Sequence, residues 1–336
     1  MAARDAILAL QSAMNAEVLG QPRLIERMLI GLLADGHLLI EGLPGLAKTR
    51  AVKAMAKHLR ADFSRIQFTP DLLPSDVTGT DIYYSDSGKS AFRFAAGPIF
   101  GNIVLADEIN RAPAKVQAAL LEAMEERQVT AGQTTHRLPV PFMVLATQNP
   151  IEQEGTYPLP EAQTDRFVMK VLVDYPTPED ELGVLRLVRS EERGERAGDP
   201  DPQPATTAEG GIAAGIAAGP DDVAAARSQV SALHVAEPIE RYIIDIVNAT
   251  RNPAPLSDDL AKAIEVGVSP RAGLALDRCA RALAWLKGED FVSPGDVQAV
   301  APDVLRHRLI LSYEARGSGR SADDVIEDLM ALVAVG

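Results

Sequence analysis

Apolar residues follow helical and strand periods in turn along the first half of the chain. Residues 4–16 and 22–34 repeat them at intervals of three and four, which predicts two amphipathic helices, and helical patterns return at 50–57 and after Pro113. Between these helices lie short apolar or alternating runs that are typical of strands. The five predicted strands are 38–40, 63–68, 102–106, 142–147 and 167–173. Strands that alternate with helices favour an α/β fold, in which a five-stranded parallel sheet is covered on both faces.

The second half of the chain changes character twice. We expect the αβα core to span residues 1–193 and a small all-α domain to span residues 223–336, where the apolar spacing is helical. Residues 194–222 are rich in proline, alanine and glycine and hold too few bulky apolar side chains to pack. That composition predicts a flexible linker between the two parts.

Two hairpins are predicted within the core. The long connection at about 70–100 carries aromatic residues on both sides of a turn at 85–89. A second hairpin is expected at about 128–138, with its turn at Gly132. Because long insertions in compact α/β domains are usually functional, we expect the first hairpin to have a role, with a decorative loop as the alternative.

Composition excludes several classes of protein. The chain has 336 residues and a formal net charge of −14, which argues against a general affinity for nucleic acid but leaves room for a local basic stripe. Cys279 is the only cysteine, so an intrachain disulfide or an all-cysteine metal site is impossible. No signal peptide is expected, and no stretch approaches the roughly 20 apolar residues that span a bilayer. We therefore expect a cytoplasmic protein that does not insert into membranes.

A glycine-containing segment joins the strand at 38–40 to the helix at 50–57 and ends in Lys48 and Thr49. This order of strand, loop and helix is that of a phosphate-binding P-loop. Backbone N–H groups would surround the phosphates of a nucleotide, Lys48 would reach the β- and γ-phosphates, and Thr49 would ligate Mg²⁺. The usual second glycine is Ala47, which leaves an ordinary strand-to-helix turn as an alternative. The candidate nucleotide contacts are Gly42, Leu43, Pro44, Gly45, Leu46, Ala47, Lys48, Thr49 and Arg50.

Polar residues follow two of the predicted strands. Asp107 and Glu108 end the apolar run 102–106, about 60 residues after the P-loop, as in a Walker-B segment. Asp107 would hold Mg²⁺, and Glu108 would orient and deprotonate the attacking water. Asn149 follows the strand at 142–147, where ligands of open α/β sheets gather, and could bind the γ-phosphate or that water. A solvated helix start and a turn before Pro150 are the alternatives.

Two arginines are candidates for contact with an anion. Arg166 precedes the last strand, and a guanidinium there could meet the charge that develops on the γ-phosphate. Arg271 is expected in the first turn of a helix, where the helix dipole repels a cation. Its placement is unfavourable unless an anion lies nearby, which makes Arg271 a better candidate than an average surface arginine.

Together these residues resemble the MoxR-type AAA+ ATPases, a group related to magnesium-chelatase and MCM helicase modules. The resemblance covers nearly the whole chain apart from the linker, and Ala47 is itself typical of the group. Its most specific segments are 41–49, 102–113, 117–130, 146–150, 155–167 and, in the lid, 269–272.

The resemblance implies roles for several residues. Asn149 would be the sensor-1 residue, Arg166 an arginine finger that acts on the neighbouring subunit, and Arg271 a sensor-2 arginine that acts in its own subunit. Gln21 would end the segment beside the adenine. The insertion at 70–100 would be the helix-2 insert, and both hairpins would face the central pore of a homo-oligomeric ring, usually a hexamer.

The resemblance therefore implies a chaperone that hydrolyses ATP with Mg²⁺. It would remodel or mature client proteins, including by metal-cofactor insertion, with a partner that carries a von Willebrand factor A domain. A nucleic-acid motor like the MCM relatives is the first alternative, and the net charge of −14 counts against it. The second is a scaffold that binds ATP with little turnover, against which the Asp107-Glu108 pair argues.

Overall fold

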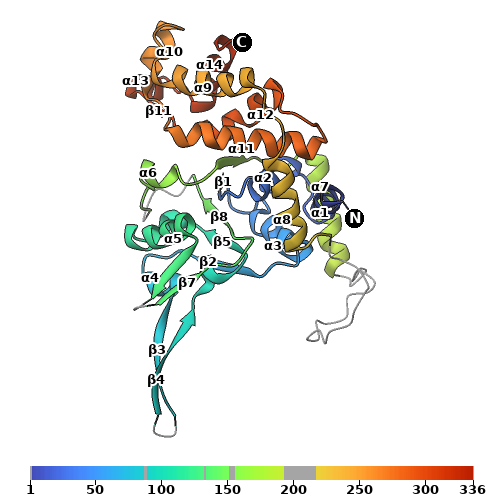
Figure 1. The fold of residues 1–336 in the computed structure, drawn as a ribbon, viewed down its shortest axis with the longest axis vertical. Coiled ribbons are helices and arrows are strands. Elements are labelled where there is room, and N and C mark those ends of the chain that lie inside the picture. Colours follow the sequence, from blue (N-terminus) through green and yellow to red (C-terminus); the bar gives the residue numbers. More distant parts are fainter. Residues whose placement is uncertain (1, 87–88, 132–133, 151–155, 193–216, 336) are drawn as a thin grey trace.

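A five-stranded parallel sheet forms the middle layer of the core (Figure 1). The computed structural model describes residues 2–86, 89–131, 134–150, 156–192 and 217–335. Across the sheet the strands are β2 (Phe63–Gln67), β5 (Ile103–Asp107), β8 (Met143–Gln148), β1 (Leu38–Gly42) and β9 (Met169–Val173). Every neighbouring pair is parallel, and Leu38 lies between Leu145 of β8 and Met169 of β9. The predicted α/β fold class is confirmed.

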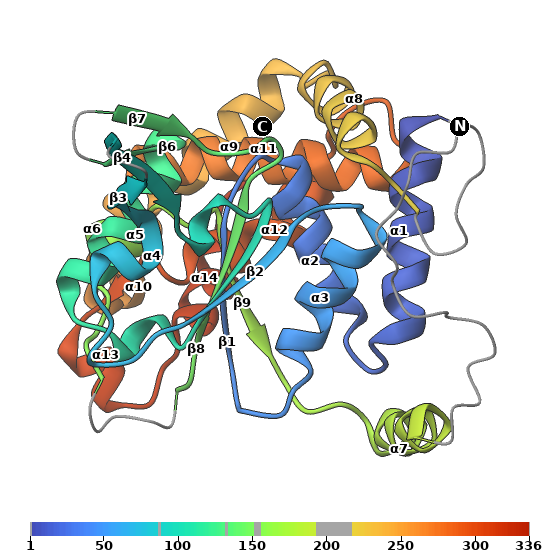
Figure 2. The same cartoon turned by 90° about the horizontal axis from the view of Figure 1, so that it is seen from below.

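Each central strand contributes side chains to two apolar layers. Ile103 and Leu105 of β5 join a cluster that includes the helices on one face, whereas Val104 and Ala106 join a second cluster on the other. Side chains alternate along a strand, so a strand that is covered on both faces needs apolar residues at every position. Helices α1 (Ala3–Glu17), α2 (Pro22–Leu33) and α3 (Lys48–His58) lie on one side of the sheet, and α4 (Pro74–Thr78) and α5 (Ala114–Glu126) on the other (Figure 2).

Two hairpins leave the core on the α5 side. They pair β3 (Gly79–Asp86) with β4 (Lys89–Ala96), and β6 (Gln128–Ala131) with β7 (Thr134–Arg137). The first extends far from the body of the molecule (Figure 1). The ring of Phe94 on β4 stacks on His136 of β7 with centroids 3.9 Å apart, so the two hairpins touch at their bases. The turn at Gly132 and the middle of the turn at 85–89 lie outside the described residues.

The remaining elements are short, apart from α7. They are η1 (Pro98–Phe100), η2 (Ile109–Arg111), α6 (Glu161–Thr164) and α7 (Pro178–Glu192). The last strand begins at Met169 rather than 167, because the Phe167 N–H donates to the Thr164 carbonyl in a turn that ends α6.

The C-terminal part is helical, as expected, with one addition. Its elements are α8 (Pro220–Ser231), α9 (Glu237–Arg251), α10 (Asp258–Ala263), β10 (Ile264–Val266), α11 (Pro270–Lys287), α12 (Pro294–Leu305), β11 (Ile310–Leu311), α13 (Tyr313–Gly317) and α14 (Ala322–Leu332). The antiparallel pair β10–β11 was not expected in an all-α domain. Ser269 caps α11, and Ser293 with Asp296 forms a capping box at α12.

Most of the predicted linker at 194–222 lies outside the described residues, but its end does not. The N–H groups of Ala217 and Ala218 donate to the carbonyl of His58, and α8 begins at Pro220. Buried residues of α8 pack into the same cluster as α1 and α2 of the core. The described end of this segment therefore follows the surface of the core, while the division into domains at 193 and 223 stays a prediction.

Buried arginines from both parts hold the helical part against the core. Arg308 is buried, donates from Nε to Asp165 Oδ1 at 2.7 Å and donates from Nη2 to the Phe167 carbonyl at 2.6 Å. Arg27 of α2 donates from Nε to the buried Asp303 at 2.6 Å. These contacts hold α12 across β9 and fix the turn that precedes that strand.

Candidate active site

The loop between β1 and α3 has the backbone that a phosphate site requires. Gly42 closes β1 beside β9, where a Cβ would lie 2.8 Å from the Val173 carbonyl, so a larger residue does not fit. Gly45 adopts φ +86°, a conformation that favours glycine. Ala47 is also left-handed, with φ +56° and ψ +14°, and it directly precedes the first residue of α3.

Ala47 therefore occupies the conformation for which glycine is the usual residue. A left-handed residue with a Cβ costs roughly 1–2 kcal/mol. This backbone places the N-terminus of α3 at the wall of a cavity beyond the carboxyl end of β1, where N–H groups and the helix dipole favour an anion.

Lys48 begins α3, and its ammonium donates to the carbonyl of Gly42. Burial lowers the pKa of Lys48, while the carboxylates of Asp107 and Glu108 act in the opposite direction. The lysine is thus held inside the loop, beside the two acids at the end of β5.

A buried threonine organises those two acids. Thr147 of β8 donates from Oγ1 to Asp107 Oδ1 at 2.6 Å and accepts the N–H of Glu108 at 2.9 Å. Glu108 has a left-handed backbone, with φ +56° and ψ +50°. Strain of this kind persists only where the surroundings hold it, and the Thr147 hydroxyl is one contact that does so.

The sequence interpretation missed the residues that pair with these carboxylates. Arg65 donates from Nη2 to Asp107 Oδ2 at 2.6 Å, and Gln67 donates from Nε2 to Glu108 Oε2 at 2.8 Å. Arg111 lies 3.1 Å from the same Glu108 oxygen. Arg65 and Gln67 alternate along β2, so their polarity was visible in the sequence. Only the strand order, which places β2 beside β5, shows that they reach the acids.

Five predicted residues meet at one cavity of about 360 Å³: Lys48, Thr49, Asp107, Glu108 and Asn149. It lies at the carboxyl ends of β1, β5 and β8, where open parallel sheets bind ligands. Its wall also includes four predicted loop residues, Pro44 to Ala47, the predicted Arg50 of α3, and Thr147 and Gln148 of β8. Gly42, Leu43 and Gln21 are not part of this wall, and the Gln21 amide donates to the Asp174 carbonyl at 3.0 Å.

The donor set of this cavity fits a magnesium nucleotide. Hydroxyl and carboxylate oxygens suit Mg²⁺, and Thr49 and Asp107 supply one of each. Among the described residues no group of three or more His, Cys, Asp or Glu side chains could hold a metal. Mg²⁺ is usually bound by one or two carboxylates and completes its shell with phosphates and water.

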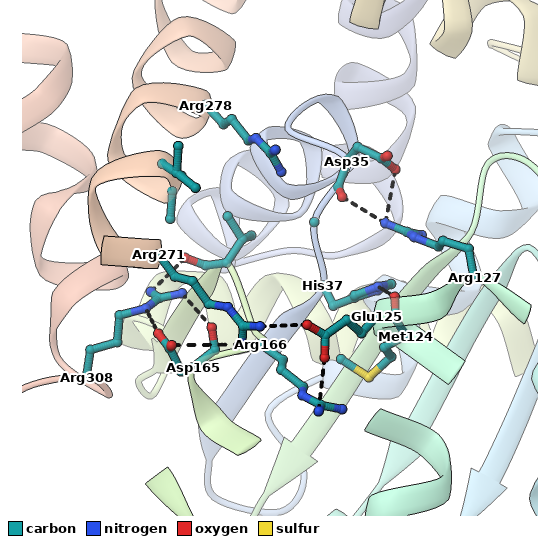
Figure 3. A pocket seen from close by; sticks show the side chains of 14 residues that line it. Asp35, His37, Met124, Glu125, Arg127, Asp165, Arg166, Arg271, Arg278 and Arg308 are labelled. Atoms are coloured by element: carbon teal, nitrogen blue, oxygen red, sulfur yellow. Dashed lines mark hydrogen bonds and ion pairs between the residues drawn. The ribbon is translucent and has the colours of Figure 1, made fainter. Parts of the chain in front are cut away.

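Arg166 and Arg271 lie elsewhere. Both line a separate cavity of about 370 Å³, whose wall also holds His37, just before β1, and Val168, just before β9 (Figure 3). This cavity is at the amino ends of the strands, whereas Lys48 is at the carboxyl ends. The five residues of β1 span roughly 16 Å between the two edges.

The expectation that Arg271 acts on the nucleotide of its own subunit does not agree with this placement. Arg271 does not line the Lys48 cavity, and its Nη2 lies 2.6 Å from a carboxylate oxygen of Glu125 on α5. The sequence argument was that the place of Arg271 in the first turn of α11 is unfavourable unless an anion lies nearby. In the structure that anion is a glutamate of the same chain.

Fold and site together define a P-loop ATPase of the AAA class with a helical lid. The family model described as the ATPase family associated with various cellular activities (AAA) matches residues 37–169, and a model of the AAA lid domain matches residues 258–329.

Relatives refine this class. The chain is 46% identical over 319 residues to the chaperone MoxR1 of Mycobacterium tuberculosis, with 95% of this chain and 79% of the relative covered. It is 36% identical to the protein MoxR of Paracoccus denitrificans, with 91% and 89% covered. A crystal structure of a proposed ATPase from Cytophaga hutchinsonii superposes with a TM-score of 0.88 at 45% identity, with 99% and 96% covered. The chain belongs to the MoxR family of AAA ATPases.

None of the helices in the described part of the chain combines the length and apolar character needed to cross a bilayer.

Proposed function

We propose that this ATPase works with Mg²⁺ as one subunit of a ring, a hexamer, and uses hydrolysis to remodel client proteins. The separation of its catalytic groups carries the proposal. Lys48 and Glu108 line one cavity at the carboxyl edge of the sheet, while Arg166 lies at the amino edge. A head-to-tail contact between copies brings opposite edges together, and such contacts generate rings when the rotation closes.

Within one subunit, the P-loop binds the phosphates of ATP. Lys48 exchanges the Gly42 carbonyl for the β- and γ-phosphates, and Asn149 orients the attacking water or the γ-phosphate. Thr49 and Asp107 would hold Mg²⁺, which would supply positive charge to the phosphates of ATP.

Glu108 accepts the proton of the attacking water. In the structure its carboxylate is engaged by Gln67 and Arg111, so these contacts must open before Glu108 acts as a base. Its backbone stays in place meanwhile, because the Thr147 hydroxyl accepts its N–H.

The neighbouring subunit supplies the positive charge that meets the transition state. Arg166 is the arginine finger, which acts on the nucleotide of the neighbouring subunit. We extend this role to Arg271, because both arginines form ion pairs with the carboxylate of Glu125.

The hairpins are the parts proposed to contact the client in the pore. On β3–β4 the rings of Tyr83 and Phe92 meet edge to face at 5.5 Å, and their residues are 57% and 73% exposed. Exposed aromatic groups of this kind suit transient contact with an unfolded or loosely packed chain. We also propose a partner with a von Willebrand factor A domain, clients that include enzymes receiving metal cofactors, and action in the cytoplasm, where ATP is supplied.

Mixed-subunit ATPase assays test the proposal. We expect Lys48→Ala to lose ATP binding, and Glu108→Gln to bind ATP without turning it over. Arg166→Ala should also be inactive alone, but mixing it with Glu108→Gln subunits should restore part of the turnover, because each then supplies what the other lacks. Normal ATP hydrolysis by Arg166→Ala in an assembled ring would refute the proposal that Arg166 acts on the neighbouring subunit. Stimulation of the ATPase activity by DNA at physiological salt would instead favour a nucleic-acid motor.

A further inference from the structure

Glu125 joins the two arginines that lie at the amino edge of the sheet. One oxygen of its carboxylate is 2.9 Å from Arg166 Nη2, and the other is 2.6 Å from Arg271 Nη2 (Figure 3). Arg166 precedes β9 of the core, whereas Arg271 is in the first turn of α11 in the lid. A single side chain on α5 therefore bridges core and lid through two guanidinium groups.

Helix electrostatics disfavour both of the positions that meet here. Glu125 is in the last turn of α5, where the negative end of the helix dipole opposes a carboxylate. Arg271 is in the first turn of α11, where the positive end opposes a cation. The charge of each residue offsets the unfavourable interaction of the other with its helix dipole. The contact therefore contributes more to stability than an ordinary surface ion pair.

The surroundings hold Arg166 in place, and they leave N–H groups of both Arg166 and Arg271 available to donate hydrogen bonds. Asp165, next to Arg166 in the chain, is bound by the buried Arg308 through its carboxylate and its carbonyl. Glu125 contacts one terminal nitrogen of each guanidinium, and both arginine side chains are partly exposed, at 29% for Arg166 and 47% for Arg271. A guanidinium carries five N–H groups, so donors remain on each for an anion that enters this cavity.

We propose that Glu125 is a positioning residue that holds Arg166 and Arg271 as one pair for the γ-phosphate of the neighbouring subunit. This inference rests on the proposed function, because it requires that Arg166 acts in trans. Without the Glu125 carboxylate, the two guanidinium groups would lose the anion that they share. Asp165 Oδ2 would remain 4.0 Å from Arg271 Nη1, but repulsion between like charges would move the lid arginine away from the core arginine. The two would then no longer meet the same phosphate.

Glu125→Gln tests the role, and Glu126→Gln is its matched control. A glutamine at 125 has one acceptor oxygen and one amide that only donates, so it cannot hold both arginines. Glu126 is the next residue of the same helix end, is exposed, and forms no ion pair within the part of the chain that the structure describes, so its substitution changes the charge alone. We expect Glu125→Gln to lower kcat at least about tenfold, since small misplacements of catalytic groups cost up to about 100-fold. The KM for ATP should change less than about twofold, because each subunit binds ATP with its own P-loop.

ATPase assays of mixed subunits distinguish a positioning role of Glu125 from a purely structural one. Glu125→Gln subunits retain their own Lys48 and Glu108, so Glu108→Gln subunits should restore part of their turnover, as for Arg166→Ala. A defect that mixing does not relieve places Glu125 in its own active site or in folding, and it overturns the inference.

The two proposals fail differently. Wild-type kcat for Glu125→Gln beside an inactive Arg166→Ala refutes the role of Glu125 and leaves the trans site standing. Full activity of Arg166→Ala removes the proposed function itself. A fall in kcat for Glu126→Gln equal to that for Glu125→Gln attributes the effect to net charge and also overturns the inference.

Discussion

Acid should destabilise this protein through His37, the residue that precedes β1. The His37 ring is buried between strands: Nδ1 accepts the N–H of Val144 at 2.9 Å, and Nε2 faces the carbonyl of Met124 at 3.2 Å. Burial lowers its pKa from 6.5 to about 3, and the nearby charge of Arg127 acts in the same direction. A protonated ring could no longer accept from Val144.

The sign and size of the effect follow from linkage. Below pH 6.5 His37 becomes protonated in the unfolded chain, whereas in the folded chain it stays neutral down to about pH 3. The contribution of His37 to the free energy of unfolding is therefore fully present above pH 6.5 and is lost as the pH falls toward 3. Each pKa unit corresponds to about 1.4 kcal/mol, which gives a total of roughly 5 kcal/mol. Between pH 7 and pH 5 the loss should be about 2 kcal/mol.

Denaturant titrations at pH 7 and pH 5 measure this loss. The fall in the free energy of unfolding should be about 2 kcal/mol smaller in His37→Gln than in the wild type, because glutamine can donate and accept here without titrating. Each protein is compared with itself, so the fixed cost of the substitution cancels. The control is His234→Gln, at an exposed histidine, whose free energy of unfolding should fall between pH 7 and pH 5 by as much as that of the wild type. Equal losses in His37→Gln and the wild type would refute the assignment of this pH dependence to His37.

Substitutions at two further positions, Thr147 and Ala47, address the acids and the loop of the active site. Thr147→Val should destabilise the protein by about 1–3 kcal/mol and lower kcat, because it removes the acceptor of the Glu108 N–H and the donor to Asp107. Thr147→Ser keeps the hydroxyl and should retain both stability and kcat. Denaturation midpoints and ATPase rates measure these effects, and a wild-type rate for the valine variant would contradict the reasoning. Ala47→Gly should change stability by less than about 1 kcal/mol, because relief of the left-handed strain is offset by the greater entropy of the unfolded chain. Ala47→Val should be clearly less stable than Ala47→Gly, since a β-branched residue is poorly tolerated at positive φ, and equal thermal midpoints would count against strain at this position.

Local patterns determined much of what the structure contains. Apolar or alternating runs predicted both ends of every strand of the parallel sheet to within two residues. The central strands are apolar throughout because both of their faces are covered. The P-loop and the Asp107-Glu108 pair were equally visible, since their chemistry depends on residues that are adjacent in the chain. Even the need for an anion beside Arg271 could be argued from its expected place in a helix.

Contacts across the sheet were beyond the reach of these patterns. The order β2-β5-β8-β1-β9 is what brings Gln67 to Glu108 and Thr147 to Asp107. Glu125 carried the same kind of signal as Arg271, an unfavourable charge at a helix end, but nothing in the sequence paired the two.

The sequence by itself thus determined the fold class, the nucleotide loop and its acids, because hydrophobic period and neighbouring residues act over short distances along the chain. Only the tertiary structure decided that Arg271 shares Glu125 with Arg166 at the amino edge of the sheet, away from the Lys48 cavity. The position of the lid depends on long-range packing of α11 and α12 against the core, and no local pattern encodes it.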